Sequence, residues 1–186
     1  LRIIERFSGR NDIELIKIDE DKRKDLAERK RLINSSDFTF LCLPDAAAIE
    51  AVSLVENDHV RILDASTAHR TNDNWVYGFP ELSAEQREKI KNTKRLAVPG
   101  CYASGFVSLV NPLVSAGIMQ KDFPVFAYAT SGYSGAGKKA IAVYEGADKP
   151  YEFNSPRQYA LTQAHKHLPE MQKITGLSMK PMFNPI

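Results

Sequence analysis

The sequence has no long apolar run, no strong charge of either sign and only two cysteines among its 186 residues. A membrane-spanning helix needs about 20 consecutive apolar residues, and the first residues lack the charged-then-apolar pattern of a secretory signal. The net charge is +2, with both signs interspersed, which excludes the concentrated basic surface typical of nucleic-acid-binding proteins. These absences predict a cytoplasmic protein whose partner is a small molecule, not a nucleic acid or a membrane.

A further absence is the fingerprint G-x-G-x-x-G, which holds the pyrophosphate in dinucleotide-binding folds. The chain opens on 1–9, where the apolar spacing predicts a helix that ends at Gly9. No strand or glycine-rich turn precedes it. We therefore expect a native chain with about 15 to 20 further N-terminal residues that hold this strand and turn, and with a longer continuation after Ile186.

Strands and helices alternate through the first part of the chain. The patterns predict strands at 12–18, 37–43, 60–66 and 95–98 and helices at 21–35, 45–57, 83–92 and 104–117, with Asp45 as an N-cap. Such alternation is typical of a parallel sheet with helices on both faces. The predicted fold is α/β, a Rossmann-like doubly wound parallel sheet in a dinucleotide-binding domain over residues 1–100.

The pattern changes after Ala116. A strand with a glycine-rich loop is predicted over 124–139, a strand over 158–167 and a short helix over 168–176. We interpret residues 101–186 as the start of an α+β catalytic or dimerisation domain, with too few strands to close a sheet of its own.

The most informative residues follow three predicted strands, at 43–45, 64–70 and 99–101. Ligands of open α/β sheets bind where the strands end at their carboxyl edge. The three segments therefore predict one cleft, in which Leu43, Pro44 and Ser66 are candidates for contact with a cofactor.

Cys101 follows Pro99-Gly100, where a strand is expected to turn into a helix. The unpaired N–H groups and the dipole of a helix start favour a thiolate, so Cys101 is the candidate nucleophile. Cys42 lies inside the apolar run 40–43, where a small buried core thiol is the simpler interpretation.

A nucleophilic thiol needs an acid or base partner, and the sequence offers His59, His69, His165 and His167. His59 lies in a polar loop, and His69 could line the cleft. His165 and His167 have strand spacing, which would place both imidazoles on one face, and we expect a nitrogen of one of them within about 4 to 6 Å of the Cys101 sulfur. With no third cysteine and no carboxylate at matching spacing, no metal site is predicted.

Several motifs occur together in one order: DASTAHR, VYGFPEL, PGCYASG, SGYSGAGK and HKHLPEM. In this order and spacing they resemble the N-acetyl-gamma-glutamyl-phosphate reductases of arginine biosynthesis, in their shorter bacterial form, over nearly the whole chain. In the related aspartate-semialdehyde dehydrogenases an asparagine usually precedes the cysteine, where this chain has Gly100. The sequence also has Ala103-Ser104 where the family often has Pro-Thr, so the hydroxyl is kept.

The resemblance implies an NADPH-dependent reductase that works through a cysteine thioester. Cys101 would attack the acyl phosphate, His165 or His167 would act as acid or base, and helix-start N–H groups would hold the oxyanion. It also implies a homo-oligomer, a dimer or tetramer. By similarity, Ser134, Gly135 and Gly137 would lie near the nicotinamide.

The substrate-binding candidates are Arg70, Tyr102 and Ser104. The planar fork of Arg70 suits a phosphate or a carboxylate, although a surface salt bridge would use the same residue type. The cofactor type is ambiguous in the residues themselves: 19–21 is acidic, as NAD-binding folds prefer after the second strand, and 22–24 is basic, as NADP-binding folds prefer. The family implies NADP.

Two alternatives stay open at the level of sequence. A cysteine hydrolase or acyltransferase could use Cys101 and a histidine without any nucleotide, because a thiol and an imidazole alone do not separate these reaction classes. The chain could also be a remnant that serves only binding or assembly.

Overall fold

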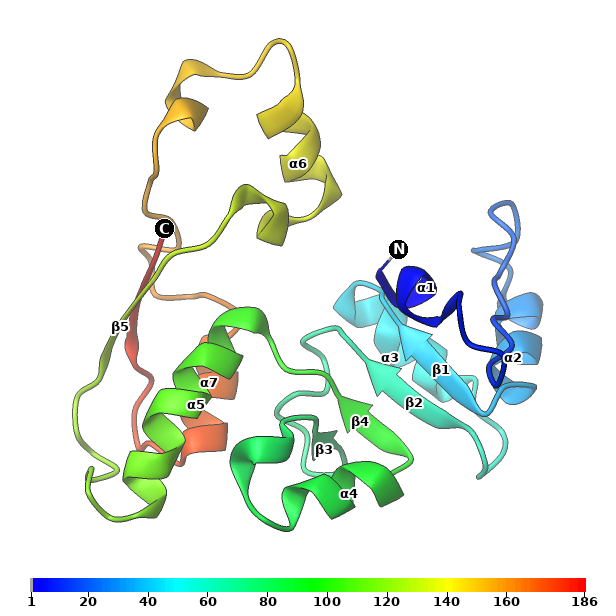
Figure 1. Ribbon diagram of the computed structural model, residues 1–186, viewed down its shortest axis with the longest axis horizontal. Helices are drawn as coiled ribbons and strands as arrows, with labels where there is room; N and C mark the ends of the chain where they lie inside the picture. Colours follow the sequence, from blue (N-terminus) through cyan, green and yellow to red (C-terminus); the bar gives the residue numbers. More distant parts are fainter. Residues whose placement is uncertain (1) are drawn as a thin grey trace. The chain divides into compact units, whose positions relative to one another are not determined.

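The computed structural model describes residues 2–186. The chain divides into two compact units (Figure 1). The first comprises the chain up to Pro80 together with Glu85–Val98, and the second comprises Glu81–Ala84 together with Pro99–Ile186. No helix within residues 2–186 has the length and apolar character needed to cross a membrane.

The first unit is built on a parallel sheet with the strand order β1-β2-β4-β3 (Figure 1). Its elements are α1 (Arg2–Phe7), α2 (Leu26–Asn34), β1 (Phe38–Leu41), α3 (Asp45–Ser53), β2 (Arg61–Asp64), β3 (Val76–Tyr77), α4 (Gln86–Asn92) and β4 (Arg95–Ala97). The short helix η1 (Pro80–Leu82) begins in this unit and ends in the second. Phe40 pairs with Leu63, and Leu63 pairs with Leu96. The predicted α/β class with a parallel sheet is confirmed.

Local chemistry explains where these elements begin. The Asp25 carboxylate accepts hydrogen bonds from the N–H groups of Ala27 and Glu28 and so caps α2. Asp45 was expected to cap α3, but the N-cap is Pro44, and Asp45 is the first helical residue. The core of the unit consists of apolar residues from α2, α3, β1, β2 and the position before β2, which are Ile33, Leu41, Ala51, Val60 and Ile62.

Two predictions for this unit are wrong. Segment 12–18 is irregular in the described structure, although a strand was expected there. A strand forms only where a neighbouring strand accepts and donates its backbone hydrogen bonds. Among the described residues, β1 at the edge of the sheet pairs with β2 alone, so segment 12–18 has no such partner. Cys42 is exposed and not part of the core. Alternate residues of a strand face opposite sides, and Leu41, which is 4% exposed, takes the buried side.

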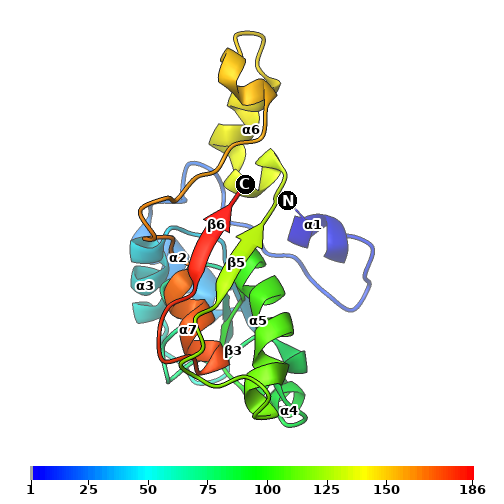
Figure 2. The ribbon, with the colours of Figure 1, turned by 90° about the vertical axis from the view of Figure 1, so that its left-hand side faces the viewer.

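The second unit contains a two-stranded parallel sheet, β5-β6, against which two helices pack (Figure 2). Its elements are α5 (Cys101–Ser115), β5 (Phe126–Ala129), η2 (Tyr133–Ala136), α6 (Lys138–Glu145), η3 (Tyr151–Asn154), α7 (Leu168–Thr175) and β6 (Met182–Pro185). The core joins residues of α5, α7 and β6 with one from the loop after α7: Ala103, Phe106, Val110, Leu168, Met171, Leu177 and Phe183. Burial of each large side chain in such a core contributes about 1.5 to 3 kcal/mol.

The strand predicted over 158–167 does not form. Ala160 has φ 53° and Gln163 has φ 55°, and this left-handed backbone is incompatible with an extended strand. The predicted helix after it is confirmed: α7 ends at Gly176, whose φ of 73° is typical of a glycine C-cap.

Candidate active site

Cys101 is the first residue of α5 and is exposed to solvent. Its predicted placement at the start of a helix is confirmed. Gly100 is the N-cap and offers no side chain to the first turn. The N–H groups of that turn have no partner within the helix, and with the helix dipole they favour negative charge at this end. A thiolate and an oxyanion both carry such a charge.

Gly100 is held by Glu170, a residue of α7. The Glu170 carboxylate is 1% exposed and accepts a hydrogen bond of 2.8 Å from the Gly100 N–H. The contact therefore anchors the turn that presents Cys101. The role of Glu170 could not be predicted from the sequence. The one signal in the sequence was the position of this carboxylate between Leu168 and Met171, two residues of α7 that belong to the core.

His165 and His167 lie in the turn before α7, where their rings are 4.7 Å apart at 85°. Tyr102, the neighbour of Cys101 in the chain, contacts both rings, at 5.8 Å for His165 and 6.0 Å for His167. The structure thus brings the histidine pair to the first turn of α5. The expected short distance from an imidazole nitrogen to the Cys101 sulfur stays a prediction.

The two histidines differ in exposure. His167 is 5% exposed, whereas His165 is half-buried. The His167 N–H donates a 3.2 Å hydrogen bond to Nδ1 of His165, so Nδ1 is an acceptor and the proton of the neutral ring lies on Nε2. Partial burial, and then the charge of Lys166, lower the pKa of His165 from its ordinary value. The lowered pKa favours the neutral imidazole, and the hydrogen bond to Nδ1 leaves Nε2–H as its donor.

A chain of hydroxyl groups borders the same place. The Tyr159 hydroxyl donates to Tyr102 Oη at 2.7 Å, and the Tyr102 hydroxyl donates to Ser131 Oγ at 2.6 Å. Burial, followed by the bond to Tyr102, raises the pKa of Tyr159 well above its ordinary value, and the charge of Cys101 adds a smaller effect in the same direction. Tyr159 and Ser131 could not be predicted from the sequence, since neither carries a local signal.

The other candidate site residues of this unit are Ser104, Ser134, Gly135 and Gly137. The Ser104 hydroxyl donates to the Gly100 carbonyl at 2.9 Å, within the first turn of α5. Ser134 and Gly135 lie in η2, and both are exposed. Gly137 has φ 85° and ψ −179°, a conformation that favours glycine. Among residues 2–186, no group of three or more His, Cys, Asp or Glu side chains could hold a metal ion.

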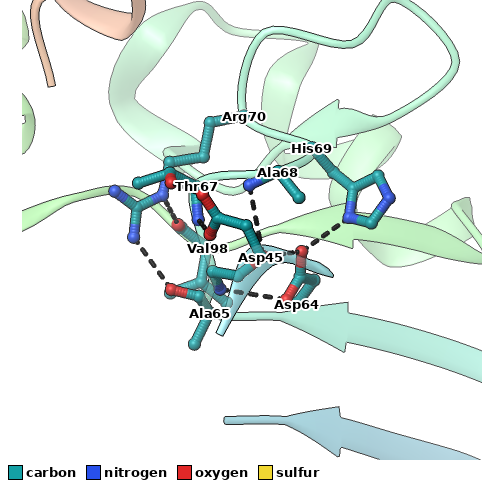
Figure 3. A network of polar contacts seen from close by, with 9 residues as sticks. Asp45, Asp64, Ala65, Thr67, Ala68, His69, Arg70 and Val98 are labelled. Carbon is teal, nitrogen blue, oxygen red and sulfur yellow. Dashed lines mark hydrogen bonds and ion pairs between the residues drawn. The ribbon is translucent and has the colours of Figure 1, made fainter. Parts of the chain in front are cut away.

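In the first unit, the loop after β2 is fixed by a network around Asp64 (Figure 3). Asp64 is fully buried and accepts hydrogen bonds from the backbone and hydroxyl of Ser66, at 2.9 and 2.6 Å. Its second oxygen lies 2.6 Å from Nδ1 of His69, whose ring stacks on Trp75 at 4.0 Å. His69 is thus held in this network.

Asp45 and Arg70 complete the network (Figure 3). The Asp45 carboxylate accepts from the Thr67 N–H at 2.9 Å and also from its hydroxyl. Arg70 is 9% exposed, and its guanidinium donates to the carbonyls of Ala65 and Val98. The guanidinium is thus engaged within the fold, and an anion would compete with these backbone acceptors.

Leu43, Pro44 and Ser66 follow the carboxyl ends of β1 and β2, as predicted. Leu43 and Pro44 are exposed, and Pro44 leaves the first turn of α3 without a side-chain cap. Ser66 is 7% exposed, and its hydroxyl is bonded to Asp64. Leu43 and Pro44 are thus accessible at this edge of the sheet, whereas the Ser66 side chain is not.

Comparison with known families divides the chain in the same way. Residues 8–92 match the family described as "Semialdehyde dehydrogenase, NAD binding domain". Residues 101–186 match the family described as "Semialdehyde dehydrogenase, dimerisation domain". An NAD-binding domain is therefore present, and it is followed by a domain of the dimerisation type.

Among curated proteins, the chain is 50% identical over 192 residues to N-acetyl-gamma-glutamyl-phosphate reductase of Trichormus variabilis. It is 46% identical over 187 residues to N-acetyl-gamma-glutamyl-phosphate reductase 2 of Pseudomonas putida. Each comparison covers 100% of this chain, and the chain spans 59% of each relative.

Among solved structures, aspartate semialdehyde dehydrogenase from Francisella tularensis matches with a TM-score of 0.55 at 14% identity, over 100% of this chain and 66% of that one. Aspartate semialdehyde dehydrogenase II from Vibrio cholerae matches with a TM-score of 0.51 at 16% identity, over 82% of this chain and 51% of that one. At such low identity these matches show a shared fold.

Proposed function

Because the chain belongs to the semialdehyde dehydrogenase family, we propose that the protein reduces N-acetyl-gamma-glutamyl phosphate to N-acetylglutamate 5-semialdehyde and phosphate, a step of arginine biosynthesis. The resemblance carried by its sequence motifs is confirmed at the level of the family. The observation that carries the proposal is the position of Cys101, exposed at the start of α5 and followed by Tyr102, whose ring contacts both histidines.

Cys101 acts as the nucleophile. Its thiolate attacks the carbonyl carbon of the acyl phosphate, a C–S bond forms, and the C–O bond to phosphate breaks, so that inorganic phosphate leaves and a thioester remains on the cysteine. Negative charge develops on the carbonyl oxygen during this step. The N–H groups of the first turn of α5 are suited to stabilise it.

His165 is the better candidate for proton transfer. It is half-buried, whereas His167 is buried and serves as the N-cap residue of α7. The neutral His165 ring carries its proton on Nε2, from which it can donate to the oxygen of the hemithioacetal that follows reduction. When the hydroxyl then returns its proton to Nε2 of His165, the C=O bond forms and the C–S bond breaks, so that Cys101 regains its thiolate and the aldehyde is released.

NADPH, when bound, supplies the hydride that reduces the thioester. The carboxyl edge of the first unit fits such a group, because Leu43 and Pro44 are exposed there and the first turn of α3 has no side-chain cap. Contact with Ser66 would require its hydroxyl to leave Asp64. In the second unit, Ser134, Gly135 and Gly137 remain the candidates for contact with the nicotinamide.

The substrate roles of Arg70, Tyr102 and Ser104 belong to the same proposal. Tyr102 has the strongest support, because it follows Cys101 and contacts both histidines. Arg70 has less support, since its guanidinium is bonded to backbone carbonyls. A homo-oligomer, either a dimer or a tetramer, is proposed from the match of residues 101–186 to a dimerisation domain, and a cytoplasmic location remains a prediction.

The reaction can be measured in both directions with the full-length protein. We expect NADPH oxidation that requires N-acetyl-gamma-glutamyl phosphate, and NADP reduction by the semialdehyde that requires inorganic phosphate. NADH should be the poorer donor. Phosphate release from the acyl phosphate without nucleotide would instead favour a cysteine hydrolase. Neither activity, together with no NADPH binding by fluorescence titration, would favour a binding or assembly role.

The two histidines can be separated by matched variants. His165→Asn is expected to lower kcat by about 10²- to 10⁴-fold, the usual range for loss of a general acid or base. His167→Asn should act mainly on stability, measured as the midpoint of urea unfolding. Because burial lowers the pKa of His165, the neutral ring persists at pH 7, and kcat should fall only as the pH decreases through that lowered pKa. The opposite ranking of the two variants in kcat would assign the role to His167.

A further inference from the structure

The loop that carries Tyr159 and His165 has an unfavourable backbone. It contains two non-glycine residues in the left-handed region, Ala160 at φ 53° and Gln163 at φ 55°. This conformation is disfavoured for residues with a side chain and persists only where surrounding contacts enforce it. Within the described residues, the contacts that enforce it come largely from β6.

Gln163 supplies the most specific of these contacts. Its Nε2 donates to the carbonyl of Phe183 at 2.8 Å, and its Oε1 accepts from the N–H of Phe183 at 2.7 Å. One side-chain amide therefore satisfies both backbone groups of a residue in β6, as a neighbouring strand would. The Tyr159 N–H also donates to the Pro185 carbonyl, at 3.1 Å.

The outer edge of β6 is free to receive this amide because of strand register. Met182 and Ile186 donate their N–H groups to Val125 and Ala129, toward β5. In a parallel strand, successive residues direct their backbone groups to opposite sides, so those of Phe183 face away from β5. The loop 158–167 thus replaces a third strand at this edge.

Phe183 also connects this contact to the imidazole. Its backbone binds Gln163, and its ring packs against the His165 ring at 5.1 Å and 68°. The carbonyl of His165 accepts from the Leu168 N–H at 3.0 Å, and its Nδ1 accepts from the His167 N–H. The position at which Gln163 binds β6 therefore determines where the His165 ring lies.

We propose that Gln163 is a positioning residue for His165: its amide binds β6 in the manner of a strand and so holds the His165 ring, with Nε2–H as donor, in place for proton transfer. The inference rests on the proposed function, because it assigns Gln163 to the same reaction. Gln163 itself touches no reacting atom.

The test compares Gln163→Met, which has similar length and no amide, with Gln158→Met, an exposed glutamine at the start of the same loop. In the full-length protein, Gln163→Met is expected to lower kcat by about 10- to 100-fold, since small displacements of a catalytic group have effects of this size. The KM for the acyl phosphate should change by less than about threefold. Gln163→Glu, which keeps an acceptor for the Phe183 N–H, should lie between Gln163→Met and the wild type.

A double-mutant cycle distinguishes the positioning of His165 from a purely structural role of Gln163. In a His165→Asn background, Gln163→Met should lower kcat by less than about twofold, because the residue acts through an imidazole that is already gone. An equal loss in both backgrounds would overturn the proposal. So would equal values of kcat for Gln163→Met and Gln158→Met.

An NMR titration of His165 gives a readout that does not depend on activity. The groups that face this ring are Tyr102, Tyr159 and His167, together with the charge of Lys166. Loosening the loop should weaken the Nδ1 contact with the His167 N–H and move the pKa of His165 back toward its ordinary value. Gln158→Met should leave it unchanged. An unchanged pKa in Gln163→Met and Gln163→Glu would contradict the inference, whereas a shifted pKa in a protein without reductase activity would contradict only the proposed function.

Discussion

Cys101→Ser is expected to abolish phosphate-dependent oxidation of the semialdehyde in the full-length protein, with a loss of about 10³-fold or more. A serine hydroxyl has the same position at the start of α5 but remains protonated near neutral pH, so it lacks the nucleophilicity of a thiolate. Binding of NADPH, followed by its fluorescence, should persist, because the substitution changes one atom outside the NAD-binding domain.

The matched control is Cys42→Ser. Cys42 is the other cysteine of the chain and is also exposed, so this variant tests whether the loss follows from removing any accessible thiol. It should keep kcat within about twofold of the wild type, since exposed positions away from special contacts tolerate substitution. If Cys101→Ser keeps more than a few per cent of the activity, the thioester mechanism is wrong.

The second large effect is expected for Glu170→Ala. The substitution removes a carboxylate that is 1% exposed and leaves the Gly100 N–H, its donor at 2.8 Å, without that acceptor. An unsatisfied buried group and a small cavity together should lower the free energy of unfolding by about 2 to 4 kcal/mol. Because Gly100 precedes Cys101, the turn that presents the thiol should loosen, and kcat should fall by about 10²-fold.

Two variants make this prediction specific. Glu170→Gln keeps an oxygen acceptor of the same reach and should retain much of the stability and activity. Glu152→Ala removes an exposed glutamate from the same unit and should change neither the urea midpoint nor kcat. A Glu170→Ala protein that unfolds at the urea concentration of the wild type would show that the contact with Gly100 does not stabilise the fold.

Some features of the fold and the site could be predicted because their signals are local. The apolar runs that became β1, β2 and β4 are bounded by turn residues, and Pro99-Gly100 marks the point where β4 gives way to α5. The start of that helix placed Cys101 at its first position. Gly176, likewise, marks the end of α7. Each of these signals acts over a few residues, through backbone conformation and the groups left unpaired at a helix end.

Burial and long-range hydrogen bonds were decided by the tertiary structure. The apolar alternation of 12–18 did not make a strand, because a strand depends on a ladder neighbour that its own residues do not specify. The sequence 158–167 was compatible with a strand, but Gln163 binds Phe183 from a left-handed backbone. Cys42 is exposed because Leu41 takes the buried side of β1.

The site shows the same division. Cys101 and the histidine pair could be proposed from residue type and spacing, whereas Glu170 could not, because its partner Gly100 is 70 residues away in the chain. Arg70 remains a candidate for anion binding, and the sequence did not show that its guanidinium donates to the carbonyls of Ala65 and Val98. The sequence by itself determined which side chains are candidates for the chemistry, since reactivity belongs to the side chain. Only the tertiary structure decided which partners hold them, because contacts between distant segments form when the chain has packed.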